Sequence, residues 1–182
     1  PGMVIITPAD AVEARLAVKA AIDYEGPVYL RFGRLAVPTI FGDDYKFEIG
    51  KGVEIEDGTD VTLIATGLMV PEALEARKLL SEEGISARVL NIATIKPIDK
   101  DIIIKAANET GAIVTAEEHN INGGLGSAVA EVLAENSPVP MQRIGTRDVF
   151  GRSGKPAELI KLYKLDAASI AEAAKKAVSR KA

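Results

Sequence analysis

Short apolar runs alternate with longer stretches of helical periodicity along this chain, and this alternation constrains the fold more than any other feature. The apolar runs have the length of buried strands, and they lie at 4–7, 28–30, 53–55, 61–66, 87–92, 112–116 and 139–144. The stretches with helical spacing of apolar residues lie at 10–24, 71–83, 97–108, 123–135, 156–163 and 167–178. Strands that alternate with helices of this length predict an α/β protein with a three-layer α/β/α arrangement and a mostly parallel sheet.

The first 34 residues predict one βαβ unit. Asp10 is a suitable N-cap for the helix, Glu13 completes a capping-box spacing, and Gly26 with Pro27 ends the helix before the next strand. From residue 35 to residue 52 the pattern weakens into prolines, glycines and a pair of aspartates, which indicates a linker. A second strand–helix series begins at Gly52, so the sequence predicts two units joined by a linker.

Composition excludes several classes of function. The chain has 182 residues, which fits one domain or one domain and a piece of another. It has no cysteine, so disulfides, thiolate zinc sites and cysteine nucleophiles are excluded, and its 1 histidine, His119, excludes any site that needs two. A net charge of −4 with mixed signs argues against a nucleic-acid-binding surface.

The same sequence predicts a soluble, cytoplasmic protein. No apolar run approaches the roughly 18 residues that span a bilayer. Charged residues such as Asp10 and Arg15 interrupt the N-terminal stretch, which a signal peptide would not allow. The chain opens at Pro1 and enters a strand at once, which favours a fragment or a processed chain.

Ligands of open α/β sheets bind beyond the carboxyl ends of the strands, where four loops are candidates. The loop that follows the strand at 28–30 carries Arg31 and Arg34, which could clamp a phosphate. The residue types alone favour solvated or ion-paired arginines there. The loop at 65–69 has one glycine and is a weak phosphate cradle. The loop at 147–154 carries no nucleophile beside a base.

The remaining loop, at 117–127, combines acidic residues, His119 and glycines. A helix that begins after glycines can bind an anion, but the spacing departs from the dinucleotide motif, because Val129 stands where a third glycine belongs. Glu117, Glu118 and His119 carry metal-ligand atoms, yet adjacent residues rarely converge on one ion. The alternative is that they form hydrogen bonds across a domain or subunit contact. The residues alone therefore predict loops that favour the binding of anions, without a complete active site.

Several stretches together resemble one family, and they occur in the family's order over essentially all 182 residues. They are Pro8-Ala9-Asp10, Gly26-Pro27-Val28-Tyr29-Leu30-Arg31-Phe32-Gly33-Arg34, Ile95-Lys96-Pro97-Ile98-Asp99, Ala116-Glu117-Glu118-His119, Gly123-Gly124-Leu125-Gly126 and Phe150-Gly151-Arg152-Ser153-Gly154. The chain resembles the C-terminal part of transketolases, particularly the C-terminal subunit of the split, two-chain kind.

The resemblance implies a domain organisation and an activity. Residues 1–40 would be the last piece of a thiamine-pyrimidine-binding domain, 41–52 a linker, and 53–182 the transketolase C-terminal domain. The complete enzyme would use thiamine diphosphate and Mg²⁺ to move a two-carbon ketol unit between sugar phosphates in the pentose phosphate pathway. It would require an N-terminal transketolase portion or subunit as partner and would form a homodimer.

The resemblance also limits which site residues are expected here. The family's catalytic glutamate and histidine precede the first residue, and its metal and diphosphate ligands lie in another domain. No catalytic, cofactor-binding or metal-binding residue is therefore expected, and the isolated chain would be inactive, bind no cofactor and serve assembly. The family's contact to the substrate phosphate corresponds to Arg34, with Arg31 as second choice.

Three alternatives remain open at the level of sequence. The same pattern occurs in 1-deoxyxylulose-5-phosphate synthase and in the E1 β subunits of 2-oxoacid dehydrogenases. Arg31 and Arg34 favour a phosphorylated substrate over the dehydrogenases, and Phe32-Gly33 leans away from the synthase. A non-catalytic interaction domain is the third alternative.

Residues 1–40 cannot bury enough surface alone, so we expect them to pack on the second unit or to pair with a second copy.

Overall fold

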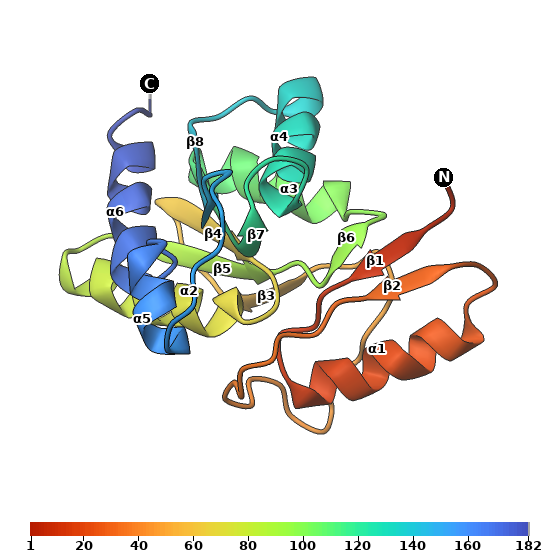
Figure 1. The fold of residues 1–182 in the computed structure, drawn as a ribbon. Helices are drawn as coiled ribbons and strands as arrows, with labels where there is room; N and C mark the ends of the chain where they lie inside the picture. The colour runs from red at the N-terminus through yellow and green to blue at the C-terminus, as the bar shows by residue number, and fades with distance from the viewer. Residues whose placement is uncertain (182) are drawn as a thin grey trace.

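The computed structural model describes residues 1–181, and its larger sheet has five strands in the order β3-β5-β4-β7-β8 (Figure 1). The strands are β3 (Val53–Glu56), β4 (Val61–Ala65), β5 (Ala87–Asn91), β7 (Ile113–Asn120) and β8 (Met141–Thr146). β5, β4, β7 and β8 are parallel, and only the edge strand β3 runs antiparallel to its neighbour β5. The prediction of a mostly parallel sheet is confirmed.

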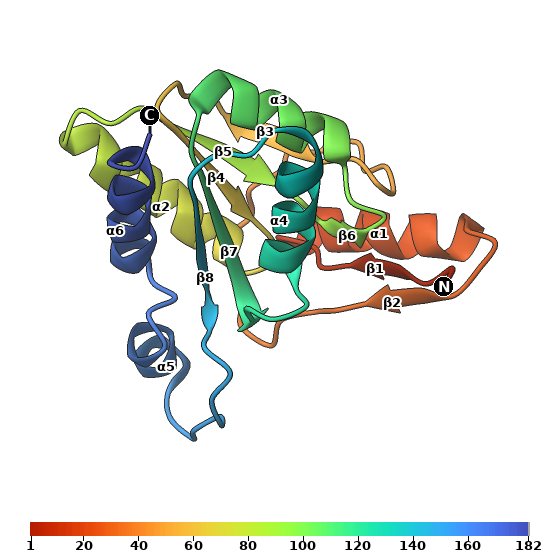
Figure 2. The ribbon, with the colours of Figure 1, turned by 90° about the horizontal axis from the view of Figure 1, so that it is seen from above.

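Helices cover both faces of this sheet (Figure 2). The helices are α2 (Met69–Glu82) and α6 (Ala167–Val178) on one face, and α3 (Lys100–Thr110) and α4 (Leu125–Asn136) on the other. Neighbouring strand residues point to opposite faces, so Leu63 packs under α2 and α6 while Ile64 packs under α3 and α4. The predicted three-layer α/β/α arrangement is confirmed, and the short α5 (Pro156–Leu162) lies beyond the end of β8.

The N-terminal unit has its own small sheet. It consists of β1 (Val4–Ile6), α1 (Ala11–Asp23) and β2 (Val28–Leu30), and β1 and β2 are parallel. β1 also pairs antiparallel with β6 (Thr94–Lys96), which gives the order β2-β1-β6. The sequence pattern did not predict β6. Because β6 follows β5 closely in the chain, it docks the first unit against the second, which confirms the first of the two packing alternatives.

A buried polar network reinforces this junction. Asp10 caps α1 by accepting a hydrogen bond from the Glu13 backbone N–H at 2.8 Å, as the capping-box spacing predicts. The Glu13 carboxylate, which is fully buried, accepts hydrogen bonds from the Ala9 backbone N–H at 2.7 Å, the Tyr45 hydroxyl at 2.6 Å and the Asn91 amide at 2.7 Å. One carboxylate thus joins α1, the linker and β5.

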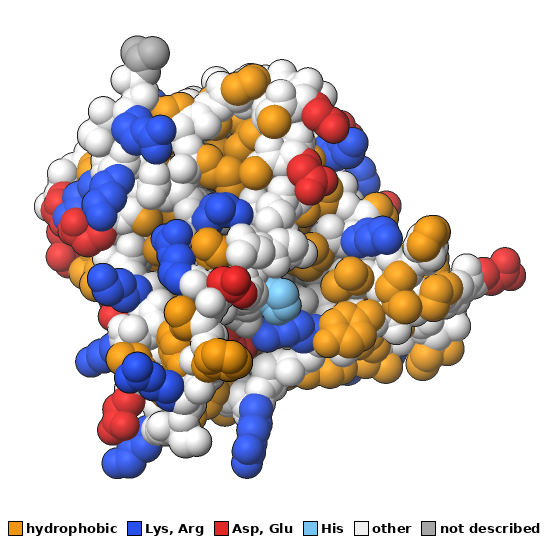
Figure 3. Space-filling view, turned by 45° about the horizontal axis from the view of Figure 1, so that its top comes forward, with side chains coloured by type: hydrophobic (Ala, Val, Ile, Leu, Met, Phe, Trp, Pro, Cys, Tyr) orange, Lys and Arg blue, Asp and Glu red, His pale blue; other side chains and the backbone are white. Residues whose placement is uncertain are grey.

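The outer surface of the N-terminal unit is apolar. Figure 3 shows hydrophobic side chains gathered over this part of the molecule. The exposed hydrophobic residues of this unit include Met3, Ile22, Tyr29 and Phe32, each at least 40% exposed. Within residues 1–181, no helix has the length and apolar character needed to cross a bilayer.

Candidate functional site

The loop after β2 is fixed to the end of β7. The Arg31 backbone N–H donates to the Ile6 carbonyl at 2.8 Å, which extends the pairing of β1 and β2 by one residue. Its guanidinium donates to the Glu118 backbone carbonyl at 2.7 Å and lies 3.5 Å from the Glu118 carboxylate. Arg31 therefore links the carboxyl ends of strands in two different sheets, and part of its hydrogen-bonding capacity is already used.

Arg34 lies in a different environment. It is exposed, four residues beyond the end of β2, and within residues 1–181 its side chain makes no hydrogen bond or ion pair. Gly33, which precedes it, lies beside Leu68, where an added Cβ would be 3.4 Å from a Leu68 methyl group. The fold thus brings the loops after β2, β4 and β7 to one edge, with Arg31 anchored and Arg34 available to an anion.

The structure gives Glu117 a role that the loop pattern did not predict. β7 continues to Asn120, so Glu117 is a strand residue, and its 3%-exposed carboxylate accepts hydrogen bonds from the Leu125 and Gly126 backbone N–H groups, both at 2.8 Å. Gly124 has no room for a side chain, because a Cβ there would lie 1.9 Å from a Glu117 oxygen. The hypothesis that the start of α4 binds an external anion is wrong, since the protein's own carboxylate occupies that position.

Replacing Glu117 by alanine should therefore destabilise the fold. Two N–H groups at the start of α4 would lose their acceptor, and we expect the free energy of unfolding to fall by roughly 2–3 kcal/mol. Urea denaturation followed by circular dichroism measures this loss. Glu131→Ala, which removes an exposed carboxylate from the same helix, is the control and should change stability by less than about 0.5 kcal/mol. Equal losses in the two variants would contradict the capping role.

His119 is exposed near the end of β7, and Figure 3 shows it in pale blue. Its Nδ1 atom is 3.0 Å from the Asn120 carbonyl and 4.0 Å from the Glu117 carboxylate. Within the described part of the chain, no three acidic or histidine side chains are arranged to hold a metal ion. The glycine-preceded helix start at 123–126 does not fit a diphosphate, because the Glu117 carboxylate occupies it.

The anchor of Arg31 is the site feature that sequence reasoning missed. Glu118 is 87 residues away in the chain and uses its backbone carbonyl, an atom that every residue has. No local pattern could have indicated this contact. The roles of Arg31 and Arg34 toward a substrate remain predictions.

Comparisons with known proteins agree over the whole chain. The sequence profile described as "Transketolase, C-terminal domain" matches residues 50–170. An apulose-4-phosphate transketolase subunit from Phocaeicola vulgatus is 47% identical over 96% of this chain and 56% of its own length. 1-Deoxy-D-xylulose-5-phosphate synthase 1 of Geobacter sulfurreducens is 42% identical over 95% of this chain and 28% of its own length.

Solved structures show the same similarity. A split-gene transketolase described as an inactive beta4 tetramer superimposes with a TM-score of 0.98 and 49% identity, covering 100% of this chain and 60% of its own. The chain spans about half the length of the curated transketolase subunits and sections it matches.

Proposed function

The chain belongs to the transketolase C-terminal domain family, and we propose from this premise that it is the C-terminal portion of a thiamine-diphosphate enzyme that transfers two-carbon ketol units between sugar phosphates. The observation that carries the proposal is the pair of arginines at the carboxyl edge of β2. Arg31 is held by Glu118, and Arg34 beside it has a free, exposed guanidinium. Such a guanidinium can donate two parallel hydrogen bonds to a phosphate.

The proposal includes a partner, because the family's metal and diphosphate ligands lie in another domain. The partner is an N-terminal transketolase portion or subunit that supplies the sites for thiamine diphosphate and Mg²⁺, and the assembled enzyme is a homodimer. The exposed apolar surface of the N-terminal unit supports this assembly, since contiguous apolar patches mark protein contacts. Residues 1–40 would complete the thiamine-pyrimidine-binding domain, with 41–52 as linker and 53–182 as the C-terminal domain. A cytoplasmic location and a place in the pentose phosphate pathway belong to the same proposal.

Reconstitution tests this proposal. The chain alone should neither transfer ketol units nor show saturable binding of thiamine diphosphate with Mg²⁺ in calorimetry. Mixed with the N-terminal portion, it should give transfer from a ketose phosphate to an aldose phosphate, with activity proportional to the limiting component. Turnover by the chain alone, or a micromolar binding isotherm for the cofactor, would contradict the assignment of the cofactor site to the partner.

A second candidate reaction is favoured by the 42% identity to 1-deoxy-D-xylulose-5-phosphate synthase. By the family resemblance, such an enzyme shares the cofactor but decarboxylates an oxoacid, for which pyruvate is a simple probe. The two reactions use different donor substrates. The reconstituted enzyme should therefore be supplied with an aldose phosphate and either a ketose phosphate or pyruvate. Carbon dioxide release from pyruvate would favour the synthase. Activity with neither donor would favour the non-catalytic interaction domain.

A further inference from the structure

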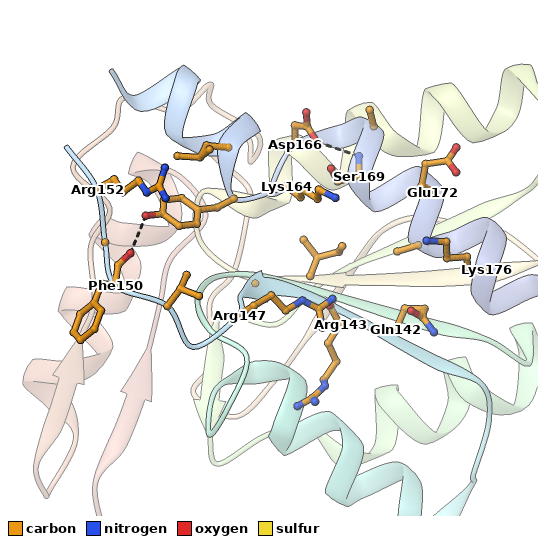
Figure 4. Close-up of a pocket in the computed structure, with 18 residues that line it drawn as sticks. Gln142, Arg143, Arg147, Phe150, Arg152, Lys164, Asp166, Ser169, Glu172 and Lys176 are labelled. Carbon is orange, nitrogen blue, oxygen red and sulfur yellow. Dashed lines mark hydrogen bonds between the residues drawn. The ribbon is translucent and has the colours of Figure 1, made fainter. Parts of the chain in front are cut away.

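A hollow lies between β8, the loop after it, and helices α5 and α6. Its volume is about 1050 Å³, comparable to or above that of typical small-molecule sites. Figure 4 shows Arg147 on the strand side and Lys164 on the helix side, with Arg152 toward one end and Lys176 toward the other. We refer to this space, lined by these four residues, as the basic hollow. It belongs to the C-terminal unit and shares none of these residues with the edge that carries Arg31 and Arg34.

Basic side chains outnumber acidic ones in the lining of the basic hollow. Among residues 1–181, none of its four basic side chains forms an ion pair with a carboxylate. The Arg147 guanidinium donates only to the Arg143 backbone carbonyl, at 3.0 Å. This arrangement stands out in a chain with a net charge of −4.

The lining also contains two acidic residues. Asp166 caps α6 by accepting a hydrogen bond from the Ser169 backbone N–H at 3.1 Å. Glu172 pairs with Lys175, which lies outside the lining, and it also interacts electrostatically with Lys176. With Arg143, five basic side chains line the hollow against these two carboxylates, so the net charge of the lining stays positive.

The backbone conformation of Lys164 and two apolar residues of the lining also suit the binding of a ligand. Lys164 has a φ of 55°, a left-handed conformation that costs a lysine roughly 1–2 kcal/mol and that fixes where its side chain leaves the end of α5. Val149 and Leu162 also line the hollow, yet they are 58% and 51% exposed. A ligand with an apolar body would cover both while its charged end meets the cations.

We propose that the basic hollow binds a small organic phosphate that carries at least two negative charges on one end and an uncharged apolar or planar body on the other. Thiamine diphosphate lies outside this class, because its thiazolium ring is positively charged and would be repelled by the basic side chains. Inorganic pyrophosphate, ADP and adenosine serve as probes, because they separate the charged end from the body. In about 0.1 M salt, which screens distant charges, calorimetry of this chain should show saturable binding of ADP, weaker binding of pyrophosphate and no measurable binding of adenosine. ADP should also raise the melting temperature, because it binds only the folded chain.

Paired variants test where ADP binds. Lys164→Gln with Lys176→Gln should weaken ADP binding about 10-fold or more, since two charge-assisted contacts are lost. Lys46→Gln with Lys51→Gln removes the same charge from two exposed lysines of the linker and should leave ADP affinity within about 2-fold. The double variant Lys164→Gln, Lys176→Gln also relieves repulsion between cations, so the melting temperature of this variant without ligand should not fall. The proposal is overturned if both pairs lose affinity equally, if adenosine binds as tightly as ADP, or if ADP binding never saturates.

Discussion

Replacing Glu13 by alanine is expected to lower the free energy of unfolding by roughly 3–5 kcal/mol, a large part of the stability of a domain. The carboxylate accepts hydrogen bonds from Ala9, Tyr45 and Asn91, and its removal leaves these donors without a partner in a fully buried position. Each unsatisfied buried donor costs about 1–3 kcal/mol, and the cavity adds to the loss. Urea denaturation measures the effect. Glu82→Ala, at an exposed position of α2, is the matched control and should change stability by less than about 0.5 kcal/mol.

The titration of Glu13 gives a second measurement of the same site. Burial raises the pKa of Glu13 above its ordinary value of 4.5, although its hydrogen bonds oppose the shift. The folded chain then binds more protons than the unfolded chain between 4.5 and the raised pKa, so this contribution to stability is present below pH 4.5 and is lost as the pH rises through the folded value. Glu13→Gln cannot titrate. The side-chain carbonyl oxygen of Asn91, which has no hydrogen-bond partner among residues 1–181, can accept from the new amide after a flip. The difference in stability between the original chain and Glu13→Gln should therefore change with pH only in this window.

Replacing Arg34 by alanine in the reconstituted enzyme is expected to raise the KM for phosphorylated sugars by roughly 10- to 100-fold. A charge-assisted hydrogen bond contributes about 1.5–3 kcal/mol, and each 1.4 kcal/mol corresponds to about a factor of 10. The KM for an unphosphorylated sugar should stay unchanged, because the contact is made to the phosphate alone. Steady-state kinetics with matched phosphorylated and unphosphorylated acceptors separates the two effects.

Arg180→Ala provides the control for Arg34, since it removes an exposed arginine from the far end of the chain. It should leave both KM values unchanged. If Arg34→Ala raised the two KM values equally, the side chain would serve the loop and not the phosphate. A drop in kcat without a change in KM would likewise argue against a ground-state phosphate contact.

The layered fold could be predicted from sequence because its signals are local. The run at 61–66 and the helical spacing at 71–83 carry their periodicity within a few residues, and β4 and α2 lie there. β6 could not be predicted, because three residues between an apolar strand and Pro97 carry no period of their own. They become a strand only by pairing with β1, which lies about ninety residues earlier in the chain.

The candidate site likewise combines features that could be predicted from sequence with features that could not. The position of Arg31 and Arg34 in the loop after β2 could be predicted, because they follow a recognisable strand, while their role toward a phosphate stays a prediction. The burial of Glu117 could not be predicted, since it depends on β7 continuing through Asn120 and on α4 starting against it. The basic hollow combines residues 147, 152, 164 and 176, and only the packing of α5 and α6 beside β8 brings them together.

The docking of the N-terminal unit has a consequence for protein synthesis. The contacts that secure it reach far along the chain, with 78 residues between Glu13 and Asn91 and 87 between Arg31 and Glu118. At about 5–20 residues per second, a ribosome needs roughly 4–17 seconds to translate that interval. During this time β1, α1 and β2 are already synthesised while β6 and β7 do not yet exist. The contacts of the first unit with β5, β6 and β7 therefore form only after the middle of the chain has been translated.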